Sequence, residues 1–392
     1  MAEILVTHGA HFVRGPAGHV HAVDGVTDYA FWCRYLTVFD GLVVAARVGA
    51  VSEEPSSLPR ADGPGVRFHD LPDYLGPWQY LRRRRDLTGR LREAVAQASA
   101  HCLRVPCAVG TLAWRELCRI GRPFGVEVMG DPWDALAPGS VRTIVRPLAR
   151  RWLARDLRRQ CRTAAAAAYV TRDSLQRRYP PAPDRFTTHY SSVELLEDAV
   201  VDTPRADFGS ARRLISVGSL EVLFKGPDLL IRALARVDRS DLHLTIVGEG
   251  RTRGWLEALA ASEGVAARVT FAGTLPAGAG VRAALDAADL FVLPSRTEGL
   301  PRALIEAMAR GLPCIGSTAG GMPELLAPED LVPPGDVEAL AGKIAEFVNH
   351  PDRMRAAAER NLARSEDYLN ERLATRRVAF YTELRRVCCE EA

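Results

Sequence analysis

Two glutamates, Glu298 and Glu306, lie close together in the segment TEGLPRALIEAMARGLP. The preceding run, Asp289 to Ser295, is short and apolar, which predicts a buried parallel strand. Pro301 suits the first turn of a helix because its missing N–H would have no partner there, and Gly311 predicts the C-terminal end of that helix. We therefore expect Glu298 on the loop at the carboxyl end of a strand, and Glu306 on the helix, facing the same crevice.

This placement indicates a ligand that carries both hydroxyls and phosphates. Crevices at the carboxyl ends of strands bind ligands in doubly wound sheets, and a helix N-terminus offers free amides to an anion. A nucleotide sugar is such a ligand. Lys225 precedes Gly226 and Pro227 at the start of another expected helix, so an ammonium and helix amides could act together on phosphate. Only two of the 51 lysine and arginine residues are lysines, Lys225 and Lys343.

The composition is that of a two-domain globular protein. The 392 residues are 47% hydrophobic and 25% charged, and no apolar run has the length of a membrane span. The N-terminal residues read as a first strand, not as a signal peptide. Eight cysteines without zinc-like spacing indicate reduced cytosolic thiols, and a net charge of +3 gives no case for nucleic acid. The chain contains no Asp-x-Asp triplet, which agrees with a metal-free mechanism.

Short apolar runs alternate with helical stretches, which predicts a parallel α/β architecture. The strands expected in the first half are Ile4–Thr7, Leu42–Ala46, Val66–His69, Gly125–Met129 and Ala167–Thr171. The helices expected there are Tyr29–Tyr35, Leu87–Ala100, Leu112–Arg119, Arg146–Arg162 and Ser174–Tyr179. The second half restarts with strands at 213–218, 242–247, 269–272, 289–295 and 313–317, separated by helices, and a further helix is expected to open at Glu324.

These elements predict two Rossmann-like doubly wound domains that face each other across a cleft. We expect an acceptor-binding domain at 1–190, a connection at 191–210 and a nucleotide-sugar-binding domain at 211–365. The remaining helix, 366–392, is expected to cross back to the first domain.

The second half resembles family 4 of the retaining glycosyltransferases, which have the GT-B fold. The resemblance is carried, in order, by VGSLEVLFKGPDLLIRA, LTIVGEG, VTFAGTL, DLFVLPSRTEGLPRALIEAMARGLPCIG and GGMPELL. The first half is similar more loosely, through VEVMGDPWD and AAAAYVTRDSLQRRYP, and THGAHFVRGPAGHVHAVDG occupies the place of a flexible loop in that family.

The resemblance implies a role for individual residues. Glu298 would hold hydroxyls of the donor sugar, Glu306 the ribose, and Lys225 would neutralise the diphosphate; Glu298 and Lys225 are the expected catalytic residues. The other donor-binding residues implied are Gly299, Leu300, Pro301, Arg302, Gly248, Gly273 and Ser219. Ser219 stands where many relatives have arginine, so either another arginine reaches the diphosphate or amides hold it.

Four residues of the first half are expected to contact sugar or acceptor: Gly15, Gly18, His19 and Asp131. Asp131 could equally be a structural turn acid. His8, His11, His19 and His21 crowd the same N-terminal region, but no acidic partners of suitable spacing stand near them, so we predict no metal site and no cofactor. Arginine-rich segments at 82–85 and 142–162 favour either a solvated helix face or contact with a membrane surface or an anionic, lipid-linked acceptor.

The activity implied is that of a metal-independent retaining hexosyltransferase that moves a sugar from a nucleoside-diphosphate donor to an acceptor hydroxyl. Glycan, lipid-linked and secondary-metabolite (antibiotic) acceptors all fit. The expected location is cytoplasmic, with peripheral contact at the inner membrane face as a further option. The alternative is a nucleotide-sugar epimerase or phosphorylase of the same fold, and a non-catalytic sensor is a further rival. A nicotinamide-dependent oxidoreductase is disfavoured because the third glycine after Gly248 and Gly250 is Gly254, one place late for GxGxxG.

Overall fold

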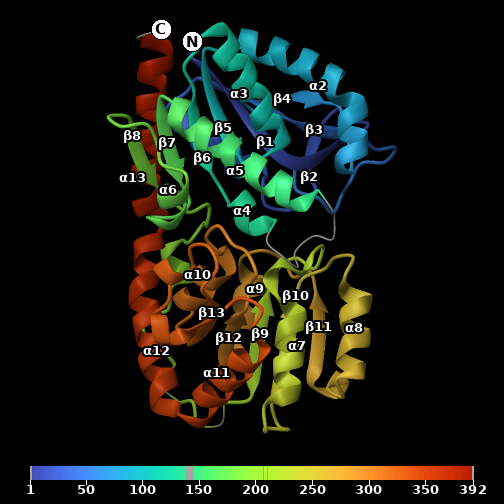
Figure 1. The fold of residues 1–392 in the computed structure, drawn as a ribbon, viewed down its shortest axis with the longest axis vertical. Coiled ribbons are helices and arrows are strands. Elements are labelled where there is room, and N and C mark those ends of the chain that lie inside the picture. Colours follow the sequence, from blue (N-terminus) through green and yellow to red (C-terminus); the bar gives the residue numbers. More distant parts are fainter. Residues whose placement is uncertain (1, 137–144, 206, 210, 391–392) are drawn as a thin grey trace.

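The protein consists of two α/β lobes arranged along its long axis (Figure 1). A computed structural model describes residues 2–136, 145–205, 207–209 and 211–390. Each lobe is built on its own sheet, and every strand pair is parallel except one hairpin. The predicted fold class, two doubly wound parallel-sheet domains, is confirmed. Alternation of short apolar strands with amphipathic helices requires helices on both faces of a sheet, and this architecture supplies them.

The N-terminal lobe has an eight-stranded sheet in its described residues. Across the sheet the strands are β4 (Val66–Leu71), β3 (Gly41–Ala50), β1 (Glu3–Arg14), β5 (Ala100–Val105), β6 (Gly125–Val128), β7 (Ala166–Tyr169) and β8 (Phe186–His189). The short strand β2 (Val20–Ala22) pairs antiparallel with the end of β1. The helices of this lobe are α1 (Tyr29–Cys33), α2 (Gly76–Gln97), α3 (Ala108–Ile120), α4 (Pro132–Ala135), α5 (Arg146–Thr163) and α6 (Ser174–Arg178).

The C-terminal lobe has a six-stranded sheet among its described residues. Its strands, in spatial order, are β11 (Val269–Gly273), β10 (His243–Val247), β9 (Arg213–Val217), β12 (Leu290–Leu293), β13 (Cys314–Ser317) and β14 (Leu331–Val332). The helices that follow these strands are α7 (Pro227–Arg236), α8 (Arg253–Ser262), α9 (Ala279–Asp286), α10 (Arg302–Ala309), α11 (Val337–Asn349) and α12 (Pro351–Ser365).

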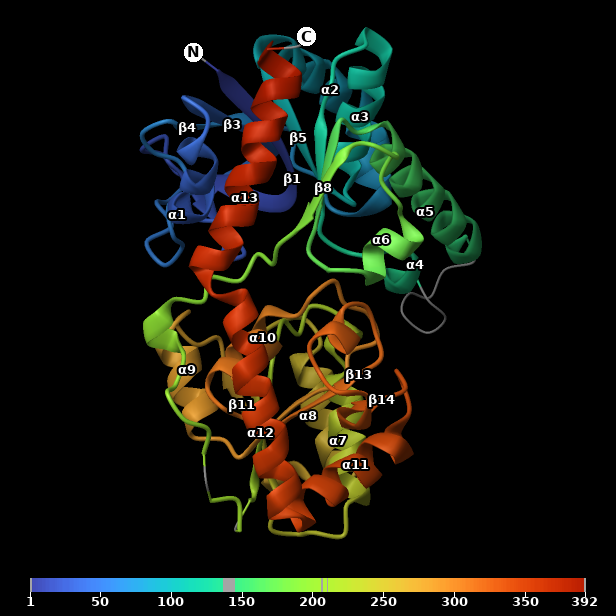
Figure 2. The same cartoon turned by 90° about the vertical axis from the view of Figure 1, so that its left-hand side faces the viewer.

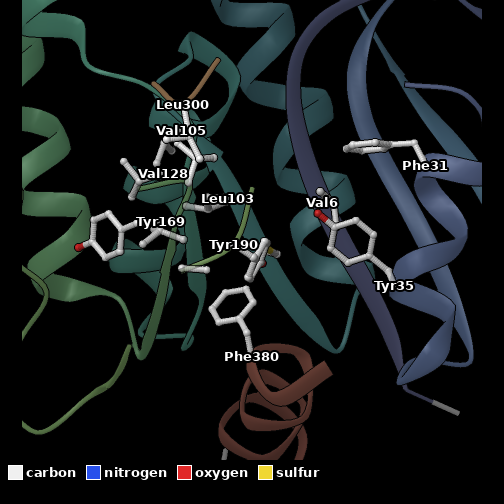
Figure 3. Close-up of a cluster of buried hydrophobic side chains, with 14 of the residues drawn as sticks. Val6, Phe31, Tyr35, Leu103, Val105, Val128, Tyr169, Tyr190, Leu300 and Phe380 are labelled. Atoms are coloured by element: carbon white, nitrogen blue, oxygen red, sulfur yellow. The ribbon is translucent and has the colours of Figure 1, made fainter. Parts of the chain in front are cut away.

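The last helix, α13 (Asn370–Arg385), runs from the C-terminal lobe along the N-terminal sheet, on the face opposite α2, α3 and α5 (Figure 2). Its buried Tyr381 stacks on Tyr35 with ring centroids 4.6 Å apart, and Phe380 points into the N-terminal core beside Tyr190 (Figure 3). These rings surround Glu127, which is 1% exposed and accepts hydrogen bonds from Arg104 and from Tyr35, Tyr190 and Tyr381. The chain end is thereby fixed to the first lobe.

Several elements differ from the sequence expectation. The strand β5 was missed because its alanine, histidine and cysteine residues continue the pattern of the preceding helix, although His101 is 1% exposed in the centre of the sheet. The half-exposed edge strand β8 is not among the strands expected in the first half. The segment after the two glycines of GGMPE forms only a 3-10 turn, Met322–Glu324, and not a longer helix.

The expectation of a flexible loop after the first strand is also wrong. β1 continues beyond Thr7 through a register shift and pairs with β3 as far as Arg14. The chain then turns back into β2, with Arg14 opposite Val20. Backbone pairing on both sides therefore orders this segment as a hairpin.

Candidate active site

Glu298 lies on the loop between β12 and α10, as the sequence predicts. Its side chain is buried, and its Oε1 accepts hydrogen bonds from Lys225 Nζ at 2.6 Å and from Ser295 Oγ at 2.7 Å. None of the described residues donates to its Oε2. One carboxylate oxygen is therefore held in place while the other remains available for a ligand hydroxyl.

Lys225 and Glu298 are 73 positions apart in the sequence, and the turn at Gly226 brings the lysine to this carboxylate. Gly226 has a φ of 71°, and a Cβ at this position would lie 2.3 Å from the Pro294 carbonyl oxygen, so only glycine permits this approach. Arg296 donates to the Leu223 carbonyl and forms a bidentate ion pair with Asp228, with both hydrogen bonds at 2.7 Å. Sequence reasoning missed Arg296, although it stands inside the quoted motif.

The two glycines of the GGMPE motif hold the Glu298 loop from the other side. The Gly321 amide donates to the Gly299 carbonyl at 2.8 Å. Gly320 has a φ of 56°, and a Cβ there would lie 2.1 Å from the Glu298 carbonyl oxygen. The motif was expected only to open a helix, but these close backbone contacts show that it positions the loop.

The helix predicted between Pro301 and Gly311 is present, but Pro301 is its N-cap, with extended backbone, and not part of its first turn. α10 begins directly after Pro301 and ends before Gly311, which has a φ of 65°. Glu306 is half-buried on this helix, and burial raises the pKa of its carboxyl, while the nearby Arg302 and Arg282 guanidinium groups act in the opposite direction. The structure joins Glu298 to Lys225, but it shows no hydrogen bond between Glu306 and either residue among those described.

The predicted nucleoside-side glycines lie at the ends of β10 and β11. Gly248 donates its amide to the Gly273 carbonyl at 2.8 Å, and a Cβ at Gly248 would lie 2.0 Å from the Gly218 carbonyl oxygen. Backbone packing alone therefore requires glycine at 248. The Ser219 hydroxyl accepts a hydrogen bond from the Glu221 amide at 3.2 Å, so it stabilises its own turn.

The N-terminal lobe contacts this loop directly. A Cβ on Gly299 would lie 2.4 Å from the Met129 carbonyl oxygen at the end of β6. The Leu300 side chain, 9% exposed, lies beside Val105 and Val128 of the first lobe (Figure 3). The loop that carries Glu298 is thus packed against the carboxyl ends of β5 and β6.

Glu324 forms a second link between the lobes, which sequence reasoning did not anticipate. Its carboxylate accepts hydrogen bonds from the backbone amides of Arg172, Asp173 and Ser174, at 2.5, 3.1 and 2.8 Å, and from the Ser174 hydroxyl. These amides stand at the N-terminus of α6, where a carboxylate is favoured by the free N–H groups and the helix dipole.

The first-lobe residues expected near the sugar have structural partners. Asp131 caps α4 by accepting from the Trp133 amide at 2.8 Å, and it is bound by Arg178 and by the Tyr179 hydroxyl. The structural alternative for Asp131 thus accounts for its contacts. Gly15 and Gly18 form the turn between β1 and β2, where the Gly18 amide donates to the Gly15 carbonyl.

The histidines of the N-terminal region have acidic neighbours after all. His11 contacts Asp73 at 2.8 Å, His19 lies 3.8 Å from Asp62, and His21 contacts Glu54 at 2.9 Å. The sequence expectation of no acidic partners is wrong, because these acids are distant in sequence and reach the histidines only through folding. No group of three or more His, Cys, Asp or Glu side chains that could hold a metal occurs within the described ranges.

Comparison with known proteins agrees with this geometry. Residues 205–364 match the family model "Glycosyl transferases group 1". CapJ of Staphylococcus aureus is 26% identical over 338 residues, which cover 86% of this chain and 83% of CapJ. A GDP-mannose-dependent phosphatidylinositol monomannoside mannosyltransferase of Corynebacterium glutamicum is 35% identical over 171 residues, 41% of this chain and 44% of that protein.

Solved structures show the same fold over the whole chain. Sucrose-phosphate synthase from Thermosynechococcus elongatus has a TM-score of 0.75 at 17% identity, with 98% of this chain and 99% of that chain covered. HepE of Anabaena, in complex with UDP-glucose, has a TM-score of 0.65 at 16% identity, with 98% of each chain covered.

The two facing α/β lobes have the GT-B fold. Residues 205–364 are similar in sequence to the group 1 glycosyl transferases. Within the described residues, no helix has the length and hydrophobicity needed to cross a membrane.

Proposed function

We propose that the protein transfers a hexose from a nucleoside-diphosphate sugar to an acceptor hydroxyl with retention of anomeric configuration. The observation that carries this proposal is the Lys225–Glu298 ion pair, which joins the turn before α7 to the loop between β12 and α10, the loop that contacts the first lobe. An ammonium and helix amides suit a diphosphate, and a fixed carboxylate suits sugar hydroxyls. HepE forms complexes with UDP and with UDP-glucose, and the Corynebacterium glutamicum mannosyltransferase is GDP-mannose-dependent, which supports a donor of this class.

In this proposal the donor lies along the carboxyl edge of the second sheet. Glu298 Oε2 holds sugar hydroxyls and Glu306 holds the ribose diol, each through charge-assisted hydrogen bonds of about 1.5–3 kcal/mol. Amides at the beginning of α10 and Lys225 Nζ bind the diphosphate, and the ends of β10 and β11 face the nucleoside. Lys225 then exchanges its contact with Glu298 for one with phosphate.

Arg302 is the strongest candidate for the cation that relatives carry at the position of Ser219. It is the first residue of α10, and none of the described carboxylates forms an ion pair with it.

The proposed chemistry exchanges one C–O bond for another. The bond from the anomeric carbon to the departing phosphate oxygen breaks, and a bond to the acceptor oxygen forms on the same face. The acceptor proton goes to an oxygen of the leaving diphosphate, so no separate protein base is assigned. Lys225 and the amides stabilise the charge that develops on the leaving group, and no cofactor is assigned.

The proposed setting is the cytoplasm, with a glycan, a lipid-linked molecule or a secondary metabolite as acceptor and with peripheral membrane contact through the arginine-rich helices. A panel of UDP-, GDP- and dTDP-sugars, analysed by mass spectrometry with and without candidate acceptors, tests the function. Transfer to an acceptor supports it. Conversion of the donor alone into an isomer would instead identify an epimerase, and sugar phosphate formed with inorganic phosphate would identify a phosphorylase.

A further inference from the structure

The groove between α4, α5 and α6 is lined by arginines that take no part in the proposed donor site. It encloses about 790 Å³. One face of α5 supplies most of the lining, and Trp133 of α4 and Arg178 of α6 complete it. The α5 arginines that line it are Arg151, Arg155, Arg158, Arg159 and Arg162.

The positive charge of this groove is largely uncompensated. Asp131 and Asp134 are both bound by Arg178, and Asp156 of α5 is buried and bound by Arg115. Arg155, Arg159 and Arg162 form no ion pair with any residue in the described part of the chain, and all three are exposed. Like charges three or four positions apart destabilise a helix, so this arrangement does not serve α5 itself. The preference for arginine over lysine throughout the chain does not explain the lack of acidic partners.

The groove adjoins the boundary between the lobes. Trp133 comes four positions after Met129 in the sequence. The Met129 carbonyl lies against Gly299, the neighbour of Glu298. The Arg150 guanidinium stacks on the Trp133 ring at 3.9 Å, and its Nε donates to the Trp133 carbonyl at 2.6 Å, which fixes this wall of the groove. In Figure 2, α4 and α6 stand at the end of the first lobe that faces the second lobe. A ligand held here is therefore within the acceptor side of the molecule.

We propose that this arginine groove binds the phosphate of a phosphorylated acceptor, a proposal that rests on the transferase function proposed above. Guanidinium groups bind phosphate through paired, charge-assisted hydrogen bonds, and several arginines on one helix face can share a diphosphate. The phosphate belongs either to a soluble acceptor or to a lipid. Val145, Leu148 and Trp152, which are 60%, 70% and 51% exposed on the same helix, provide an apolar surface beside the arginines that suits a lipid.

The test compares two triple variants with equal loss of charge. One carries Arg155→Gln, Arg159→Gln and Arg162→Gln in the groove. The other, the surface variant, carries Arg236→Gln, Arg364→Gln and Arg372→Gln at exposed positions of α7, α12 and α13. Both, and their parent, also carry Lys225→Met, so that pyrophosphate bound at the proposed donor site does not contribute. Inorganic pyrophosphate is titrated into each protein by calorimetry at fixed ionic strength.

We expect the groove variant to bind pyrophosphate at least tenfold more weakly than the parent, and the surface variant to stay within twofold. Equal losses in both variants, or no pyrophosphate binding by the parent, overturn the proposal. Thermal unfolding controls for folding. Arg155 and Arg159 lie among like charges, whereas Arg162 stands in the last turn of α5, where the helix dipole favours a cation. The melting temperature of the groove variant should therefore fall no further than that of the surface variant, and a larger fall shows that the arginines serve the fold and counts against the proposal.

Co-sedimentation with vesicles distinguishes the two phosphate sources. The vesicles contain phosphatidylcholine alone or phosphatidylcholine with phosphatidylglycerol at about 7:3. Loss of binding to the anionic vesicles in the groove variant alone assigns the phosphate to a lipid, whereas unchanged vesicle binding with lost pyrophosphate binding assigns it to a soluble acceptor. Donor binding, measured separately without the Lys225→Met change, should be unaffected in the groove variant. A protein that binds pyrophosphate in the groove but no nucleotide sugar would refute the transferase function and leave the groove assignment standing.

Discussion

Replacing Lys225 by methionine tests the centre of the proposed donor site. The Lys225 side chain lies over Gly218: a Cβ added to Gly218 would be 3.0 Å from Lys225 Cγ. Methionine keeps an unbranched side chain that can occupy this place, but it removes the ammonium. Glu298, whose side chain is 7% exposed, would lose the 2.6 Å contact and retain only Ser295 as a partner. We expect this loss to cost about 1–3 kcal/mol in the free energy of unfolding.

The effect on transfer should be larger than the effect on stability. One positioned group that stabilises developing negative charge contributes about 2.7–4 kcal/mol, so kcat/KM should fall roughly 10²- to 10³-fold. The assay is the initial rate of nucleoside-diphosphate release with the donor and acceptor identified by the panel. Lys225→Arg should recover part of the rate, because it restores the charge with a different geometry.

The second lysine of the chain provides a matched control. Lys343 pairs with Glu346 on α11 at 2.7 Å, and that glutamate side chain is 40% exposed. Lys343→Met should change stability by less than about 1 kcal/mol and leave kcat/KM unchanged. If a folded Lys225→Met variant keeps kcat/KM within threefold of the unaltered protein, Lys225 does not neutralise the leaving group and our reasoning about the pair is wrong.

Three further predictions concern the remaining acids of the site. Glu298→Ala should abolish detectable transfer with little change in melting temperature, and full activity in this variant would remove Glu298 from the site. Glu306→Gln should weaken donor binding about tenfold by calorimetry. Because burial raises the pKa of Glu306 in the folded state, its contribution to stability is present below the unfolded value of 4.5 and declines as the pH rises above it. Glu306→Gln removes a carboxyl whose ionisation is opposed by burial, so it should raise the free energy of unfolding more at pH 7 than at pH 4. An effect on stability that does not depend on pH would contradict the raised pKa. Glu324→Ala should remove the cap of α6, cost about 0.5–2 kcal/mol and raise KM for donor more than it lowers kcat; unchanged stability and kinetics would show that this link between the lobes is dispensable.

Local patterns in the sequence were sufficient to predict the framework of the site. The apolar run before Ser295, Pro301 and Gly311 correctly indicated a strand, a loop and a helix, because strand burial, proline and glycine act through the backbone within a few residues. The same reasoning failed for β5, where alanine, histidine and cysteine carry no clear strand signal and burial at the centre of the sheet decides the conformation.

Contacts between distant segments were beyond the reach of such patterns. The sequence singled out Lys225 and Glu298 separately, but their pairing depends on the approach of Gly226 to Pro294. Likewise, Glu324 meets α6 from about 150 positions away.

The sequence by itself determined the alternation of strands and helices, the two parallel sheets and the edge of the sheet at which Glu298 lies. Only the tertiary structure decided which groups meet there, that Asp131 is held by Arg178 and Tyr179, and that the arginines of α5 line one groove. The physical reason is that secondary structure follows from interactions within a few residues, whereas hydrogen bonds and ion pairs between elements require the packing of segments whose separation leaves no periodic signal.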